Sequence, residues 1–293
     1  MLRRQRTGSV ICTSCGVLVG VDDDRCYNCN RRNPGLWGFA PALRSLGHDL
    51  GFVPFVIGTC VVLYGLMLVF SLGSIGMQGM FGFASPSTPA LFLFGASGSY
   101  PVFVADRWWT VLSAAWLHGG LLHIFFNMMA VRQLAPSTAD LYGPGRMVII
   151  YVAGAIAGFA LSSLAAELLP PITIIPRLLV IRGGDFTVGS SASIAGLIGA
   201  VLAYGHRSGS GQARSYAMSY IWMLVIMGFL FPVIDNFAHA GGFAGGYLMA
   251  RFLDPLITER IDHLAIAVGC LALSVLSIVV SVLHGLQFLA PGS

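Results

Sequence analysis

Lysine is absent from this chain of 293 residues, so all 16 basic side chains are arginines. Charged residues make up only 10% of the sequence, well below the roughly 25% of an ordinary globular domain, whereas 56% are hydrophobic. The mean hydropathy is +0.80. A soluble domain this apolar could not cover its own surface, which excludes a cytosolic globular protein, a disordered chain and a collagen-like rod. The composition therefore predicts a protein whose main solvent is lipid.

A secretory signal peptide is also not expected, because no apolar run or small-residue cleavage site follows the basic residues 1–8. Residues 76–94 are apolar but broken by serines and prolines, so we expect a loop that dips into the membrane. Seven other runs are long enough to span. They are 53–72, 111–133, 146–168, 190–205, 215–234, 236–252 and 263–289.

The arginines are distributed unevenly between the two ends of these spans. If the N-terminus lies inside, seven arginines before the first span lie on the cytoplasmic side of the membrane. Six more lie there in the turns that follow the second, fourth and sixth spans. Only Arg107, Arg177 and Arg182 fall outside. The positive-inside rule then predicts a cytoplasmic N-terminus and an external C-terminus. We expect a multi-pass protein of a bacterial inner or plasma membrane, in contact with the lipid bilayer and without a nucleic-acid partner.

Four cysteines near the N-terminus form two Cys-x-x-Cys pairs, Cys12 with Cys15 and Cys26 with Cys29. Four thiolates in this pattern suit tetrahedral zinc, while iron or no metal are the alternatives. A disulfide framework is the poorer interpretation for a reducing cytoplasm. Residues 1–33 are too few to build a core, so we predict a zinc-ribbon-like head held by its metal. It either contacts a cytoplasmic partner or regulates the membrane core, unless it is a passive fold.

Residues 34–52 follow the head and place apolar side chains at helical spacing, with charged side chains opposite. This pattern predicts an amphipathic linker helix on the inner membrane surface. The second span contains His123 and Asn127, which share one helix face, since they are four residues apart. His118 lies off that face unless the helix begins after it. Such polar groups inside a membrane are usually functional, although His123 could merely bond a neighbouring helix.

Arg132 is harder to place, because it follows Asn127 by only five residues. Either the second helix continues to about Tyr142 and the arginine is buried or snorkels, or the depth assigned to Asn127 is wrong.

Ser191 opens a short helix rich in small residues, preceded by a polar stretch that must descend into the membrane to meet it. Backbone of that kind needs protein or water around it, which predicts a wet pocket with serines at its floor. The alternative is that Ser190, Ser191 and Ser193 are only small packing residues. His239 starts a later span that runs in the same direction, so it should lie level with Ser191. A serine and a histidine on closely packed helices form an activated nucleophile.

Together these residues resemble the rhomboid family of intramembrane serine proteases. The resemblance is carried by His118, His123 and Asn127 in one span, by Gly189 to Ser191 at the start of another, and by residues 235–242. It implies an all-α polytopic membrane protein, with a rhomboid-like core of six helices at residues 53–253. Residues 254–293 would then add a seventh transmembrane helix and tail. The head at 1–33 is a further addition.

The resemblance also implies a Ser–His dyad in which Ser191 is the nucleophile and His239 is the general base and acid. His123, Asn127 and the Ser191 backbone N–H would stabilise the oxyanion, with His118 near the pocket mouth. The implied activity is that of a serine-type endopeptidase, and its substrates are single-span membrane proteins, cut within or near the transmembrane segment. No cofactor is implied for catalysis; the zinc expected in the head is structural.

Several residues depart from the family pattern. Ala192 stands where glycine usually follows the nucleophile, and Ala195 where an aromatic residue often supports the histidine. The tryptophan–arginine pair of the first loop is rearranged, with Arg107 displaced. A second serine, Ser97, sits in a Gly-x-Ser-Gly match, but it opens no small-residue helix, so we interpret it as loop structure.

Two other classes of function stay open at this point. One is a proteolytically inactive rhomboid-like protein that binds membrane clients as a chaperone or adaptor. Ala192 and Ala195 favour this alternative. The other is an ion transporter that uses the intramembrane histidines. The lack of an acidic residue deep in any predicted span argues against a transporter.

Overall fold

A computed structural model describes residues 4–44, 47–78, 82–175, 179–257 and 259–289. Arg3 and Arg177, which entered the orientation argument, lie outside these residues. The strands pair as three antiparallel hairpins: β1 (Ser9–Ile11) with β2 (Leu18–Gly20), β3 (Gly76–Gln78) with β4 (Gly82–Ser85), and β5 (Ile172–Ile175) with β6 (Leu179–Ile181). The helices are η1 (Leu36–Gly38), α1 (Ala40–Arg44), α2 (Phe52–Val69), α3 (Thr88–Phe94), η2 (Tyr100–Val104), α4 (Thr110–Ser113), η3 (Ala114–Trp116), α5 (Leu121–Tyr142), α6 (Pro144–Leu168), α7 (Ser191–Ser208), α8 (Gly211–Leu230), α9 (Asn236–Phe252) and α10 (Ile261–Leu289).

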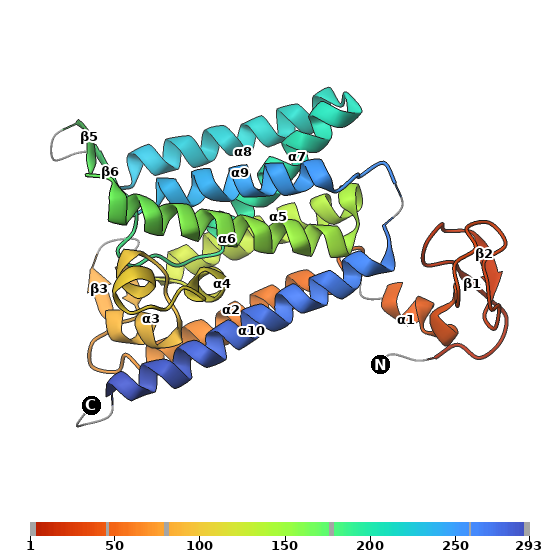
Figure 1. Cartoon of the computed structure of the whole chain (residues 1–293), viewed down its shortest axis with the longest axis horizontal. Helices are drawn as coiled ribbons and strands as arrows, with labels where there is room; N and C mark the ends of the chain where they lie inside the picture. Colours follow the sequence, from red (N-terminus) through yellow and green to blue (C-terminus); the bar gives the residue numbers. More distant parts are fainter. Residues whose placement is uncertain (1–3, 45–46, 79–81, 176–178, 258, 290–293) are drawn as a thin grey trace.

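The long helices form one bundle, with the small head at the end where α2 and α10 begin (Figure 1). Helix α7 lies at its centre, and every residue from Ala192 to Val201 is buried. Helices α6 and α9 pack most extensively against α7 and against each other, while α8 covers its outer side. The fold is thus the predicted all-α membrane architecture of six helices, α2 and α5 to α9, with α10 as the seventh.

Composition separates these helices into two groups. Four helices, α2, α6, α8 and α10, are long and apolar enough to cross a membrane, and the bent pair of α4–η3 with α5 is a fifth candidate. Helices α7 and α9 do not meet the same criterion, although the sequence predicted both as spans. Neighbouring helices cover α7 from Ala192 to Val201, so Ser193 and the glycines in that stretch need not be compatible with lipid.

The predicted second span, 111–133, has the wrong boundaries. A break at residues 117–120 separates η3 from α5, and the two parts meet at 92°. The backbone of Gly120 is fully extended there, with φ of 174°, which ends one helix and begins the next. Helix α5 therefore starts after His118 and continues to Tyr142. Arg132 is then an exposed residue in the middle of a longer helix. This agrees with the first of the two alternatives, a second helix that continues to about Tyr142.

Residues 76–94 also differ from the predicted loop. They form the hairpin β3–β4 and the seven-residue helix α3, apart from 79–81, which lie outside the described residues. The same residues that interrupt the apolar run explain the helix. The Ser87 side chain caps its N-terminus by accepting a hydrogen bond from the Ala90 N–H, and Pro89 fits the first turn.

The continuous linker helix predicted over 34–52 is wrong in the described residues. They contain only η1 and the five-residue α1. Leu36, Trp37 and Leu50 adopt positive φ values of 51°, 52° and 52°, which no α-helix accommodates. The apolar spacing is therefore real, but the backbone turns several times instead of following a single helix.

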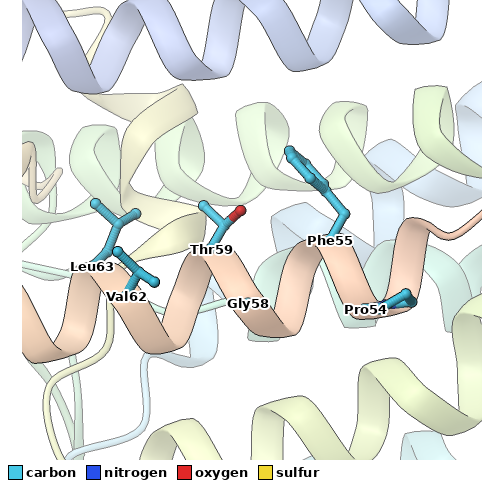
Figure 2. Close-up of a pocket in the computed structure, with 6 residues that line it drawn as sticks. All are labelled: Pro54, Phe55, Gly58, Thr59, Val62 and Leu63. Atoms are coloured by element: carbon cyan, nitrogen blue, oxygen red, sulfur yellow. The ribbon is translucent and has the colours of Figure 1, made fainter. Parts of the chain in front are cut away.

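A shallow groove of about 440 Å³ runs along the outward face of α2 (Figure 2). Its lining residues are Pro54, Phe55, Gly58, Thr59, Val62 and Leu63. A Cβ atom added at Gly58 would meet nothing within 4 Å, so this face is free of protein contacts there. The groove is apolar and lies on a membrane-span candidate, so it suits contact with lipid chains and lies apart from the polar residues considered below.

The loop before α10 is fastened to the start of α6 by a half-buried carboxylate. Glu259 Oε1 accepts a hydrogen bond of 2.6 Å from the Arg146 backbone N–H, and burial raises the pKa of Glu259. Ionising this group therefore costs stability, so Glu259→Gln, which keeps an acceptor oxygen, should be at least as stable as wild type at neutral pH. Glu259→Ala should lose about 1–2 kcal/mol, because the α6 N-terminus loses its acceptor. Thermal unfolding in detergent measures both, and equal stability of the two variants would refute this role.

Candidate active site

Three serines lie at the start of α7, and the structure distinguishes them by burial. Ser190 and Ser193 are fully buried, whereas Ser191 is partly exposed. The Ser190 hydroxyl donates to the Ala115 carbonyl at 2.8 Å, which occupies it structurally. Ser191 is the first residue of the helix proper, directly after the N-cap. Of the three hydroxyls, that of Ser191 is the one accessible to an approaching molecule.

Helices α7 and α9 contact each other along a seam of glycines. A Cβ atom added at Gly242 would overlap the Ala192 carbonyl oxygen, and one at Gly246 would overlap that of Gly196. Both steps are four residues, so the helices run parallel, and Ser191 lies level with Gly241. At 1.5 Å per residue, His239 is then displaced from Ser191 by only about 3 Å along the axis. The seam therefore holds the two residues at nearly the same height.

His239 lies in the first turn of α9 and is partly exposed. Its Nδ1 is buried without a hydrogen-bond partner, and within the described part of the chain no hydrogen bond joins its ring to Ser191. The His239 ring interacts electrostatically with the His123 ring and with the Asp235 carboxylate. Catalytic hydrogen bonds are often loose before substrate binds, so this geometry suits a histidine that closes on the serine later.

His123 contacts the backbone just before the serine helix. A Cβ atom at Gly189 would lie 2.5 Å from His123 Nε2, and Gly189 itself has φ of +127°. Glycine is needed at this position both for its backbone conformation and for the close approach of the imidazole. His118 is fully buried beside His123, with the two ring centres 5.2 Å apart. The structure thus brings both histidines of the second span to the segment that precedes Ser191.

Asn127 uses only part of its hydrogen-bonding capacity. Its Nδ2 donates to the His123 carbonyl at 2.8 Å, within the same helix, while its buried Oδ1 has no partner among the described residues. A side-chain amide nitrogen carries two N–H donors, and this hydrogen bond uses one of them. The second N–H of Asn127 therefore stays available to a bound molecule.

Two of the residues that depart from the family pattern, Ala192 and Ala195, are fully buried. A Cβ atom added at Gly158 of α6 would come within 2.7 Å of the Ala192 methyl group, so that methyl fills the space that Gly158 leaves. The Ala192 side chain thus lies in the seam between α6 and α7. Its extra carbon is accommodated where the neighbouring helix lacks one.

Asp235 links three segments around the candidate site. One carboxylate oxygen accepts from the Ala238 N–H at 2.9 Å and caps α9. The other accepts a hydrogen bond from the Ser162 hydroxyl of α6. That hydroxyl in turn accepts from the Gly184 N–H at 2.9 Å, in the loop before α7. Ser162 is the residue that sequence reasoning missed; it lies 73 positions from Asp235, and no local pattern marks it.

Ser97, the second serine in a family-like match, is part of a loop contact. It is fully buried, and its backbone exchanges two hydrogen bonds with Thr187, of 3.1 and 2.7 Å. The interpretation of Ser97 as loop structure is therefore confirmed. The contact also has a use, because Thr187 lies in the segment that leads to Ser191.

The four head cysteines converge on one point. Their sulfur atoms all lie within 4.8 Å of one another; Cys12 and Cys29 are 3.8 Å apart, and Cys15 and Cys26 are 3.5 Å apart. A tetrahedron with metal–sulfur bonds of about 2.3 Å has edges of about 3.8 Å. The residues fit a single tetrahedral metal ion.

Comparison with known proteins agrees with the architecture. The model of the rhomboid domain family matches residues 105–255, which is just over half of the chain and contains α5 to α9 with Ser191 and His239. The chain therefore belongs to the rhomboid family.

Three relatives show what the similarity covers. The "Rhomboid protease GluP" of Bacillus subtilis (strain 168) is 30% identical over 172 residues, which are 58% of this chain and 30% of that protein. "RHOMBOID-like protein 7" of Arabidopsis thaliana is 28% identical over 173 residues, covering 57% and 50%. "Inactive RHOMBOID-like protein 8" of the same plant is 30% identical over 139 residues, covering 46% and 35%. The matched stretch thus spans between 30% and 50% of the length of these relatives.

Proposed function

We propose that this protein is an intramembrane serine endopeptidase that cleaves single-span membrane proteins within or near their transmembrane segment. The observation that carries the proposal is the seam between α7 and α9. It holds Ser191, the accessible serine, level with His239. Membership of a family that includes a named protease supports the same activity.

In the proposed reaction, Ser191 Oγ attacks the scissile carbonyl carbon while His239 takes its proton. The His239 proton then passes to the leaving amine, and water later hydrolyses the acyl-enzyme with the same histidine as base. His123, beside Gly189, and the Ser191 backbone N–H stabilise the oxyanion, together with the second N–H of the Asn127 amide. His118 packs behind His123 and orients its ring. No metal or cofactor takes part in these steps.

Two measurements on the solubilised full chain test this function. We expect cleavage of a generic single-span substrate, and we expect labelling of the protein by a fluorophosphonate probe that reacts with activated serines. A chain that is folded but gives neither cleavage nor labelling would remove the enzyme hypothesis.

The second candidate is an inactive rhomboid-like protein that binds membrane clients as a chaperone or adaptor. Two observations favour it: the missing hydrogen bond between Ser191 and His239, and a relative named inactive at 30% identity. It predicts that clients co-purify with the chain equally well after Ser191→Ala. Retained client binding combined with absent labelling selects this function over proteolysis.

For the topology, we propose that the head lies in the cytoplasm, that the C-terminus lies outside, and that the membrane is a bacterial inner or plasma membrane. Arginines lie at the helix ends on the side of the head (Figure 1). They include Arg146, Arg207 and Arg251. This supports the positive-inside orientation. Ser191, at the opposite ends of the helices, then lies toward the outer side. The proposed parts of the chain are the head at 1–33, the linker at 34–52, the six-helix core at 53–253, and the seventh helix with its tail at 254–293.

We further propose that the head binds one structural zinc ion through Cys12, Cys15, Cys26 and Cys29, and that it docks a cytoplasmic partner or regulates the core. Among the described residues of the head, the buried members of its hydrophobic cluster are three valines and two of the cysteines, which is too little to stabilise a fold.

Removal of the metal by a strong chelator should therefore unfold the head while leaving the membrane helices intact. The measurement is limited proteolysis, in which residues 4–33 become cleavable and α2 to α10 stay protected. Cys15→Ser is expected to behave like the chelated protein, and Cys270→Ser, a cysteine within α10, is its matched control. Less than one metal ion per chain in a reduced preparation would count against zinc.

A further inference from the structure

Helix α10 lies outside the stretch that matches the family, which ends at residue 255. Most of its surface is apolar and exposed, as expected for a helix facing lipid. One face is different: Ser274, Ser277 and Ser281 are buried, at 1%, 4% and 0% exposure. Since polar groups avoid lipid, this face must be directed at protein. It packs against α3, α4 and α6 (Figure 1).

The contact with α4 is made by hydrogen bonds around Trp109. The Ser277 hydroxyl donates to the Trp109 carbonyl at 2.7 Å, and the Trp109 Nε1–H donates to the Ser281 hydroxyl at 3.0 Å. The Trp109 ring also packs edge-on against His284, one turn further along α10, with ring centres 5.6 Å apart. Two turns of α10 are therefore fixed to one residue at the start of α4.

Arg107 strengthens this contact from a fully buried position. One guanidinium nitrogen donates to the Phe92 carbonyl of α3 at 2.6 Å, and the other donates to the Ser281 carbonyl at 2.8 Å. The guanidinium carbon also lies 4.1 Å from the centre of the Phe92 ring. A charge buried this deeply is held by its hydrogen bonds, so Arg107 fixes α3 and α10 relative to each other.

The segment between α3 and α4 continues this connection toward the candidate site. Ser97 forms its pair of backbone hydrogen bonds with Thr187, and the Ser99 N–H donates to the Gly184 carbonyl at 3.1 Å. A Cβ atom at Gly98 would overlap the Asp185 carbonyl oxygen, so the two segments are in direct backbone contact. Residues 184–190 lead straight into Ser191. Their position thus depends on residues 95–99.

We propose that α10 is a positioning element of the active site, in which Arg107 and Trp109 fasten it to the segment between α3 and α4, and that segment holds residues 184–190 in place before Ser191. This inference rests on the proposed proteolytic function. It assigns a role to a helix outside the family match and makes Arg107 a positioning residue. It predicts that loosening α10 reduces the reactivity of Ser191 without any change at Ser191 itself.

The test compares Arg107→Gln with wild type in the full chain, with Arg132→Gln, the same substitution at an exposed arginine of α5, as the matched control. Backbone hydrogen exchange of residues 95–99 and 184–190 should accelerate by roughly tenfold or more, because each lost charged hydrogen bond is worth about that factor. Fluorophosphonate labelling of Ser191 should slow by a similar factor. Arg107→Lys, which keeps the charge and one donor, should restore part of both.

Trp109→Phe provides a second variant if Arg107→Gln does not fold, because it keeps the ring and removes only the N–H. Unchanged exchange in both variants overturns the inference, as does faster exchange confined to 95–99. If the wild type itself is not labelled, the proposed protease function fails, and the exchange measurements still decide whether α10 positions residues 184–190. Normal labelling in a variant with accelerated exchange also overturns it.

Discussion

Ser191→Ala is expected to abolish substrate cleavage, with a loss of roughly 10⁴-fold or more in kcat, because no other hydroxyl can replace the nucleophile. His239→Ala should cause a loss of similar size, since the serine then has no base. The double variant should be no worse than either single one, because the two residues act as a unit. Rates of cleavage of a single-span substrate in detergent, together with fluorophosphonate labelling, measure these effects.

The neighbouring serines provide the controls. Ser190→Ala removes a buried hydroxyl that bonds the Ala115 carbonyl, so it should lower stability modestly and leave labelling in place. Ser97→Ala should do the same, because its two hydrogen bonds with Thr187 come from the backbone. If labelling survives Ser191→Ala and disappears with Ser190→Ala or Ser193→Ala, the nucleophile has been assigned to the wrong residue.

Gly242→Ala is the second substitution for which we expect a large effect. The added Cβ would overlap the Ala192 carbonyl, which belongs to the backbone and cannot move without shifting α7. Overpacking of this kind costs about 1–3 kcal/mol and occasionally more. Activity should fall further than stability, because the same displacement separates Ser191 from His239. Thermal unfolding and cleavage rates of the same preparation separate the two effects.

Gly65→Ala is the matched control for this variant. Gly65 also lies within a helix, α2, but a Cβ atom there would meet nothing within 4 Å. The control should keep wild-type activity and lose no stability, since alanine favours the helix over glycine. If Gly242→Ala behaves like this control, the seam does not determine the geometry of the site.

The parts of the fold that follow from local pattern were predictable. Long apolar runs defined most of the helices, and helical spacing placed His123 and Asn127 on one face. The cysteine spacing predicted a cluster whose sulfurs do converge. The close packing expected of the helices that carry Ser191 and His239 agrees with the contacts of α9 at Gly242 and Gly246. Each of these signals lies within a few residues of the feature it reports.

Other features depend on contacts between distant segments. Ser162 supports Asp235 from another helix, and Arg107 bonds a carbonyl of α10, 174 residues away. The turns at Leu36 and Trp37 interrupt an apolar spacing that would equally suit a helix. The direction of the Asn127 amide likewise depends on its immediate surroundings. Such features require the tertiary structure, because a one-dimensional pattern contains no information about the partner.

The burial of α7 has a consequence for how the protein is made. During synthesis each segment meets the insertion machinery largely on its own, and a helix with serines, glycines and an arginine is a poor candidate to leave it for lipid. Helices α7 and α9 flank the more apolar α8 in the chain. We therefore expect α6 and α8 to enter the bilayer first and to provide the surface on which α7 and α9 can follow, so that the candidate site is assembled last.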